Sequence, residues 1–125
     1  MSATLNTRFF RTAVIYALLG MAGGIYMAAS HDHSQMPAHA YLLLLGWVSM
    51  FLYGVFYKLF PAAQSGLAAL HWWIANIGLI VMVAGIIIIY GRAPERGEIL
   101  ATVGALTNIA GMVLFAVIVF RGVRG

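Results

Sequence analysis

Hydrophobic residues are concentrated in four long runs that short polar segments separate. The runs cover about residues 12–29, 38–60, 67–90 and 97–120. Each is close to the roughly 20 apolar residues that a helix needs to cross the hydrocarbon core of a bilayer. Connections this short require neighbouring helices to run antiparallel. The pattern predicts an all-α, four-helix transmembrane bundle that forms a single integral membrane domain over residues 1–125.

The composition agrees with a membrane setting and argues against several other classes of protein. Of the 125 residues, 63% are hydrophobic and only 8% are charged, which is far more apolar than a soluble domain. The sequence has no cysteine, so disulfides and zinc–thiolate sites are excluded. The net charge is +4, but the basic residues lie at the ends of the runs instead of forming a patch. We expect the lipid bilayer as a partner and no nucleic acid.

The first apolar run has two interpretations. A basic start, an apolar stretch and the small residues Ala28, Ala29 and Ser30 also describe a secretory signal. The run is long for a signal, so we interpret it as an uncleaved first span.

The basic residues also predict the orientation in the membrane. One side holds five of them: Arg8, Arg11, Lys58, Arg121 and Arg124. The other side holds Arg92 and Arg96, partly offset by Glu95 and Glu98. Because cytoplasmic loops are rich in Lys and Arg, we expect both termini in the cytoplasm of a bacterial-type inner membrane. The loop of residues 30–38 then faces the outside.

His39 is the leading candidate for a functional residue. It lies in the first turn of the second run, between Pro37 and Pro61, and ionisable groups inside membrane spans mark functional sites by default. Regular helical spacing predicts that a set of residues shares its face: Leu42, Leu43, Gly46, Met50, Tyr53 and Tyr57. Gly46 is expected to leave a slot in which a flat group or another helix lies close.

The segment HDHSQMPAH in the first loop offers a second candidate site. His31, Asp32, His33, Met36 and His39 are plausible ligands for copper or another divalent metal. Their spacing fits no closed metal template, and histidines in polar loops are usually just solvated. Both interpretations stay open here.

The remaining polar and small residues in the spans favour structural roles. His71 precedes Trp72 and Trp73 at a span end, which is typical of an aromatic belt with a histidine that reaches the interface. His39 and His71 belong to opposite membrane faces, too far apart to ligate one iron within a subunit. Asn76 and Asn108 lie near mid-membrane and could bond each other. Glycines at packing spacing predict close helix contacts: Gly20 with Gly24, Gly78 with Gly85, and Gly104 with Gly111.

Motifs of soluble enzymes are not found. The sequence has no phosphate-binding loop, dinucleotide fingerprint or HExxH motif, and no carboxylate lies in the interior of a span, since Glu98 is at a span end. Its few carboxylates do not form an acid and base pair. Hydrolysis is not expected.

The pattern H-x6-G-W in HAYLLLLGW, continuing through SMFLYGVFYKLFP, carries a resemblance to a known family. It resembles the second helix of the catalytic subunit of haem-copper oxidases and nitric oxide reductases, especially their cytochrome oxidase C-type branch. The third run, LHWWIANIGLIVMVAGI, is similar to the helix that follows there. The resemblance covers about half the chain. It implies that His39 is an axial ligand of haem b, with Gly46 beside the porphyrin and Trp47, Met50 and Tyr53 as pocket walls.

The family also implies an assembly. Its catalytic subunit has three similar arcs of four helices around a pseudo-threefold axis, with metal-binding histidines largely on the second helix of each arc. This chain resembles one arc, so three copies would rebuild the whole. A homotrimer is therefore expected, in which His31 or His33 of a neighbour is a candidate second iron ligand.

One departure from the family changes the expected activity. The family's copper site uses a pair of adjacent histidines at a position where this chain has Ile86–Tyr90, and the sequence contains no His-His pair. Electron transfer with a redox partner, sensing or haem handling therefore fits better than reduction of oxygen. The alternative is a membrane protein without haem that handles copper or has a structural, assembly role.

Overall fold

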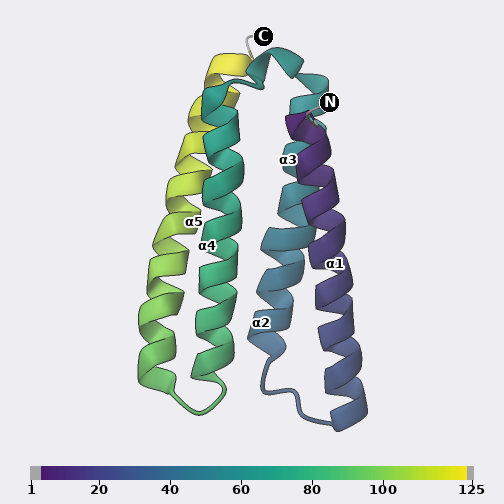
Figure 1. The fold of residues 1–125 in the computed structure, drawn as a ribbon, viewed down its shortest axis with the longest axis vertical. Helices are drawn as coiled ribbons and strands as arrows, with labels where there is room; N and C mark the ends of the chain where they lie inside the picture. The colour runs from purple at the N-terminus through teal and green to yellow at the C-terminus, as the bar shows by residue number, and fades with distance from the viewer. Residues whose placement is uncertain (1–3, 124–125) are drawn as a thin grey trace.

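The computed structural model describes residues 4–123 and consists of helices joined by short connections (Figure 1). In chain order, the helical elements are α1 (Leu5–Ser30), α2 (Met36–Tyr41), η1 (Leu42–Val48), α3 (Ser49–Leu59), η2 (Pro61–Ala63), α4 (Gly66–Ile89) and α5 (Pro94–Gly122). Four stretches are long and apolar enough to cross a membrane, since α2, η1 and α3 form one continuous span. This confirms the predicted all-helical, four-span architecture.

The first helix begins earlier than the sequence pattern predicts. The polar start of the chain was expected to precede the span, yet α1 already begins at Leu5. Gln64 accepts a hydrogen bond from the backbone N–H of Leu5 over 3.1 Å, and Arg8 stacks on the ring of Trp72 at 4.1 Å. These contacts hold the polar first turn of α1 against Gln64 and against Trp72 of α4. Arg124, which contributed to the predicted orientation, lies outside the described residues.

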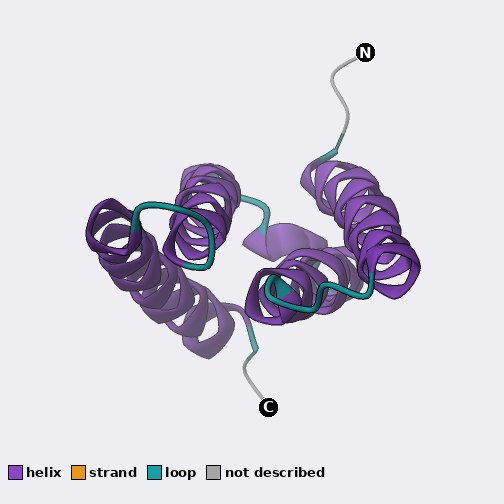
Figure 2. Ribbon diagram, turned by 90° about the horizontal axis from the view of Figure 1, so that it is seen from below, coloured by secondary structure: helices purple, strands orange, loops and turns teal. Residues whose placement is uncertain are grey.

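The bundle is built from two antiparallel helical hairpins (Figures 1 and 2). Glycines allow α4 and α5 to approach until backbone meets backbone. A Cβ atom at Gly104 would collide with the backbone of Met82, and one at Gly85 with the backbone of Ala101. In the other hairpin, Gly20 of α1 packs against Leu43. The predicted packing role of the glycines is confirmed at these positions.

The mid-membrane asparagines do not bond each other, so that expectation is wrong. Asn76 accepts a hydrogen bond from the hydroxyl of Tyr16 over 2.7 Å and donates one to the carbonyl of Trp72 over 2.8 Å. Asn108 instead lies on Gly78, and its amide nitrogen is 3.5 Å from the sulfur of Met82. The absence of a side chain at Gly78 lets Asn108 lie against α4, so the two amides have separate partners.

Aromatic side chains join the two hairpins near one end of the bundle. Phe9 of α1, Tyr53 and Tyr57 of α3, His71 of α4 and Phe115 of α5 pack ring against ring, with neighbouring centroids 4.5–6.1 Å apart. We call this set the aromatic cluster. It fixes the hairpins to each other at the end of the bundle where Thr4 and Val123 lie.

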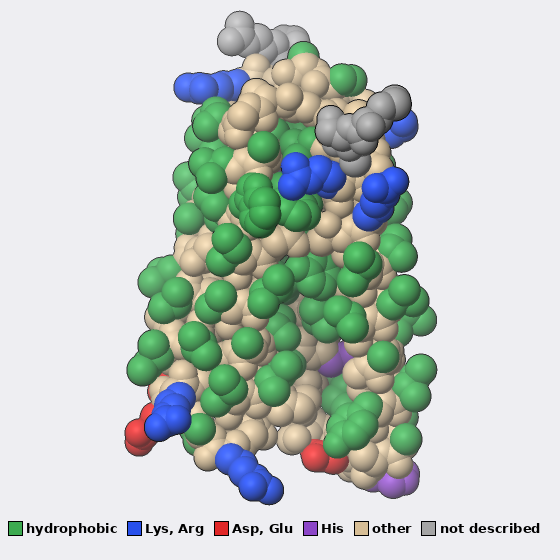
Figure 3. Space-filling model, in the orientation of Figure 1, with side chains coloured by type: hydrophobic (Ala, Val, Ile, Leu, Met, Phe, Trp, Pro, Cys, Tyr) green, Lys and Arg blue, Asp and Glu red, His purple; other side chains and the backbone are tan. Residues whose placement is uncertain are grey.

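Charged side chains collect at the two ends of the molecule, and the surface between them is hydrophobic (Figure 3). Arg8, Arg11, Lys58 and Arg121 belong to the end where the described chain begins and finishes, whereas Arg92 and Arg96 belong to the opposite end. Both described ends of the chain thus lie on the same side of the apolar band (Figure 1). This is the arrangement of an integral membrane protein with an even number of spans.

Candidate functional site

His39 is held at the start of the second span by the way the chain turns back on α1. His31 ends α1 in the left-handed conformation, with φ of 58°. A short turn follows, in which Asp32 accepts a hydrogen bond from the N–H of Ser34 over 3.0 Å. Pro37 then opens α2, since its fixed φ suits the first helical turn. The chain therefore re-enters the membrane directly beside α1, with His39 in the first turn.

The imidazole of His39 is anchored to the backbone of α1. Its Nδ1 lies 2.8 Å from the carbonyl oxygen of Gly20. Because a carbonyl can only accept, Nδ1 carries a proton, so Nε2 is the nitrogen that has the lone pair in the neutral ring. Gly24, one turn further along α1, forms the surface under the ring, and a Cβ there would lie 3.0 Å from Cε1 of His39. Two glycines thus fix both the tautomer and the position of this histidine.

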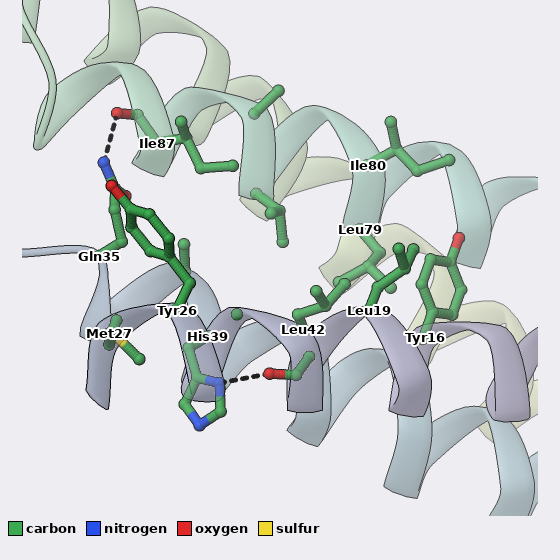
Figure 4. A pocket seen from close by; sticks show the side chains of 15 residues that line it. Tyr16, Leu19, Tyr26, Met27, Gln35, His39, Leu42, Leu79, Ile80 and Ile87 are labelled. Atoms are coloured by element: carbon green, nitrogen blue, oxygen red, sulfur yellow. Dashed lines mark hydrogen bonds between the residues drawn. The ribbon is translucent and has the colours of Figure 1, made fainter. Parts of the chain in front are cut away.

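The ring of His39 is turned away from α4. Figure 4 shows it on the far side from Ile80 and Ile87, with the bond to Gly20 at one edge and the second nitrogen directed outward. The hydrogen bond found for this ring within residues 4–123 is made by Nδ1 and not by Nε2. The site therefore presents Nε2 of a fixed imidazole toward the outside of the α1–α2 pair.

The predicted slot at Gly46 is filled by the protein itself. A Cβ at Gly46 would lie 2.6 Å from Cβ of Tyr16 and 3.1 Å from Leu79. Gly46 is buried in this contact. In this structure its small size serves helix packing and leaves no space for a flat group.

The structure does not place Met50 and Tyr53 beside His39. Residues Leu42–Val48 form a π-helix, in which the turns are wider than in an α-helix. The spacing that was used to predict a shared face is therefore lost across this segment. Met50 and Tyr53 instead line a separate cavity of about 210 Å³ between the hairpins, together with Asn108. Trp47 contacts Phe51, which contacts Phe10 of α1, so it belongs to the seam between α1 and α3.

His31 and His33 are exposed in the first loop. No group of three His, Cys, Asp or Glu side chains close enough to hold a metal ion occurs in the described part of the chain. Hydrogen bonds from the side chain and the backbone N–H of Ser34 lower the pKa of Asp32 below its ordinary value. The loop therefore contains one carboxylate that already accepts hydrogen bonds from its own turn.

His71 is a buried residue that the sequence analysis placed wrongly. It was expected to reach the membrane interface, but its exposed fraction is 0%. It lies within the aromatic cluster, 3.0 Å from the hydroxyl of Tyr57 through Nδ1, and its Nε2 has no partner among the described residues. A signal for this position does exist. His71 falls on the regular series of buried α4 residues that continues through Ala75, Gly78 and Met82.

Comparisons with known proteins give no indication of the function, so the arguments below rest on the structure. No family model matches the chain, and no curated protein or solved structure matches it.

Proposed function

We propose that the protein is a small haem-b-binding membrane protein in which Nε2 of His39 is an axial ligand of the iron. The observation that carries this proposal is the bond from Nδ1 to the carbonyl of Gly20. Metal-ligating histidines commonly donate their second ring nitrogen to a carbonyl or carboxylate, which fixes the tautomer and makes the ligating nitrogen more basic. A neutral imidazole held in this way is one of the standard axial ligands of haem.

The surroundings of His39 suit an apolar macrocycle better than a hydrated ion. The histidine lies within a membrane-spanning stretch, and its neighbours on α1 are glycine and aliphatic residues. Bound haem would supply one-electron chemistry, while the chain supplies the ligand and its orientation. Since Gly46 is occupied by Tyr16, the porphyrin would lie along the outer surface of α1 and α2 and not against Gly46.

The resemblance of HAYLLLLGW to the second helix of haem-copper oxidases supports the same ligand. The absence of a His-His pair from the sequence favours electron transfer, sensing or haem handling over oxygen reduction. The excess of basic residues at the end that holds both described chain ends supports a cytoplasmic location for the termini. The proposed location is a bacterial inner membrane, and the proposed partner is a redox protein that exchanges electrons with the haem.

The outward direction of Nε2 also supports assembly of several copies. A haem on this face of one subunit would be covered on its other side only by lipid or by another copy. We therefore propose that a neighbouring subunit closes each site, in a ring of three. His31 and His33 of the neighbour are the candidate second ligands.

Absorption spectroscopy of the purified protein tests the ligand directly. Expression with haem available should give an intense Soret band, and His39→Ala should lose it while remaining folded by circular dichroism. His33→Ala removes an exposed imidazole from the nearby loop and tests the second ligand instead. It should keep the Soret band, at a shifted position if His33 of a neighbour ligates the iron and at the wild-type position if it does not.

Chemical rescue sharpens the test. His39→Gly leaves a space that free imidazole can enter, so adding imidazole should restore the Soret band. If His39→Ala keeps haem with an unchanged spectrum, His39 is not the ligand and the proposal is wrong.

A further inference from the structure

A deep apolar cleft runs between the hairpins in the half of the bundle that the aromatic cluster does not fill. Its volume is about 520 Å³, and α1, α2, η1 and α4 line it. Figure 4 shows Leu19, Ile80 and Ile87 along its walls. These three side chains are also exposed on the surface or half-buried, so the cleft opens toward the surrounding bilayer. His39 also borders the cleft, but its ring points the other way (Figure 4).

A space of this size is not expected to stay empty. Protein interiors are packed as densely as organic crystals, and atoms that line a void lose their dispersion contacts. Small residues keep the cleft open: Gly23 of α1 and Ala84 of α4 are among those that line it. A Cβ placed on Gly23 would have no atom within 4 Å. In a membrane, the available filling is a hydrocarbon chain that enters from the side.

Tyr16 and Gln35 are two of the polar residues that line the cleft, and they differ in the hydrogen bonds that they already make. At the deep end, the hydroxyl of Tyr16 is already donated to Asn76 over 2.7 Å. At the outer end, the amide nitrogen of Gln35 donates to the carbonyl of Ile87 over 3.1 Å, which fixes the orientation of the amide. Its Oε1 is buried and has no partner among residues 4–123. The cleft therefore offers one unsatisfied hydrogen-bond acceptor at its outer end.

The dimensions fit one chain lying along the helices. Leu79 and Ile87 mark the two ends of the α4 wall, and eight residues at 1.5 Å rise correspond to roughly 12 Å. Polarity increases only toward the outer end, where lipid head groups lie. A molecule in the cleft would thus place its chain beside Tyr16 and Leu79 and its head beside Gln35.

We propose that this cleft binds a phospholipid whose head carries an N–H donor, as in phosphatidylethanolamine, with one acyl chain between α1 and α4. On binding, the Gln35 side chain turns so that its buried Oε1 reaches the cleft and accepts a hydrogen bond from the head. Phosphatidylcholine has the same chains and the same phosphate, but its nitrogen carries no hydrogen and cannot satisfy this acceptor. The site is independent of the haem proposal, since it uses neither ring nitrogen of His39.

Native mass spectrometry of the full chain, released from nanodiscs of phosphatidylethanolamine and phosphatidylcholine with identical acyl chains, tests the proposal. The wild type should retain phosphatidylethanolamine with a preference on the order of tenfold, the factor expected for one buried acceptor left unsatisfied. Gln35→Leu should abolish the preference. Equal retention of the two lipids by the wild type would overturn recognition of the head.

A second variant tests the cleft itself. Gly23→Leu places a branched side chain in open space, so the protein should fold with unchanged helicity while the retained lipid falls at least several-fold. The haem content should not change, which separates this result from any failure of the haem proposal. Undiminished lipid retention by Gly23→Leu would show that the chain does not lie in this cleft.

Discussion

Nδ1 of His71 lies 3.0 Å from the hydroxyl oxygen of Tyr57, and this fully buried contact joins the two hairpins of the bundle. Both side chains belong to the aromatic cluster. Because Nε2 of His71 has no partner in the described chain, the Tyr57 hydroxyl satisfies the ring at one nitrogen only. The pair therefore stabilises the core in two ways: its rings pack together, and its hydrogen bond gives two buried polar groups a partner.

Replacing Tyr57 by Phe should destabilise the protein. The ring contacts remain, but His71 is left with two unsatisfied nitrogens, and a buried polar group without a partner costs about 1–3 kcal/mol. Thermal unfolding in detergent, followed by circular dichroism, should show a lower midpoint than the wild type. The double variant Tyr57→Phe with His71→Phe removes both partners and should recover most of the loss. A Tyr57→Phe variant as stable as the wild type would show that the hydrogen bond contributes nothing.

Gly24→Ala should change the environment of the proposed haem iron without removing the ligand. The added methyl group would lie 3.0 Å from Cε1 of His39, so the ring must tilt and its bond to Gly20 must lengthen. We expect retained haem with shifted g values in the electron paramagnetic resonance spectrum of the ferric protein. Gly23→Ala is the matched control, because its methyl group contacts nothing within 4 Å. Identical spectra for both variants would contradict the proposed anchoring of His39 by α1.

Gly46→Ala should destabilise the bundle because Gly46 supports helix packing. Its Cβ would lie 2.6 Å from Cβ of Tyr16, and overpacking of this kind costs about 1–3 kcal/mol. The midpoint of thermal unfolding should fall, whereas Gly23→Ala should leave it unchanged or raise it. If Gly46→Ala instead keeps its stability and loses haem, Gly46 borders the cofactor and not only Tyr16.

The sequence predicts the spans well and the site only in part. Apolar runs locate the four membrane-spanning stretches, and the spacing of glycines such as Gly85 and Gly104 indicates close helix contacts, because both features depend on local chemistry. The direction in which Met50 and Tyr53 point depends on the π-helix of Leu42–Val48. No residue pattern in this segment predicts a π-helix. The spacing of small and apolar residues along α4 indicates that His71 is buried, but its partners Tyr57 and Phe115 come from other helices. Such features appear only when the helices are packed together.

The last prediction concerns assembly, and it follows from which helices have free surfaces. In the most apolar window of each span, 17% of the residues are buried in α5 and 22% in α1, compared with 44% in α4. Figure 1 shows α1 and α5 at opposite flanks of the bundle. A contact between α1 of one copy and α5 of the next joins two different surfaces, and such contacts form a closed ring when the rotation between copies closes. The outward nitrogen of His39 would lie near this contact.

Native mass spectrometry of the intact complex in mild detergent should give the mass of three chains with three haems. His39→Ala should give three chains without haem if the helix contacts alone hold the ring, and smaller species if the cofactor does. This variant separates the two sources of assembly because the contacts of His39 with Gly20 and Gly24 lie within its own subunit. A monomer or an even-numbered ring for the wild-type protein would contradict the threefold arrangement, even if the Soret band showed that haem is bound.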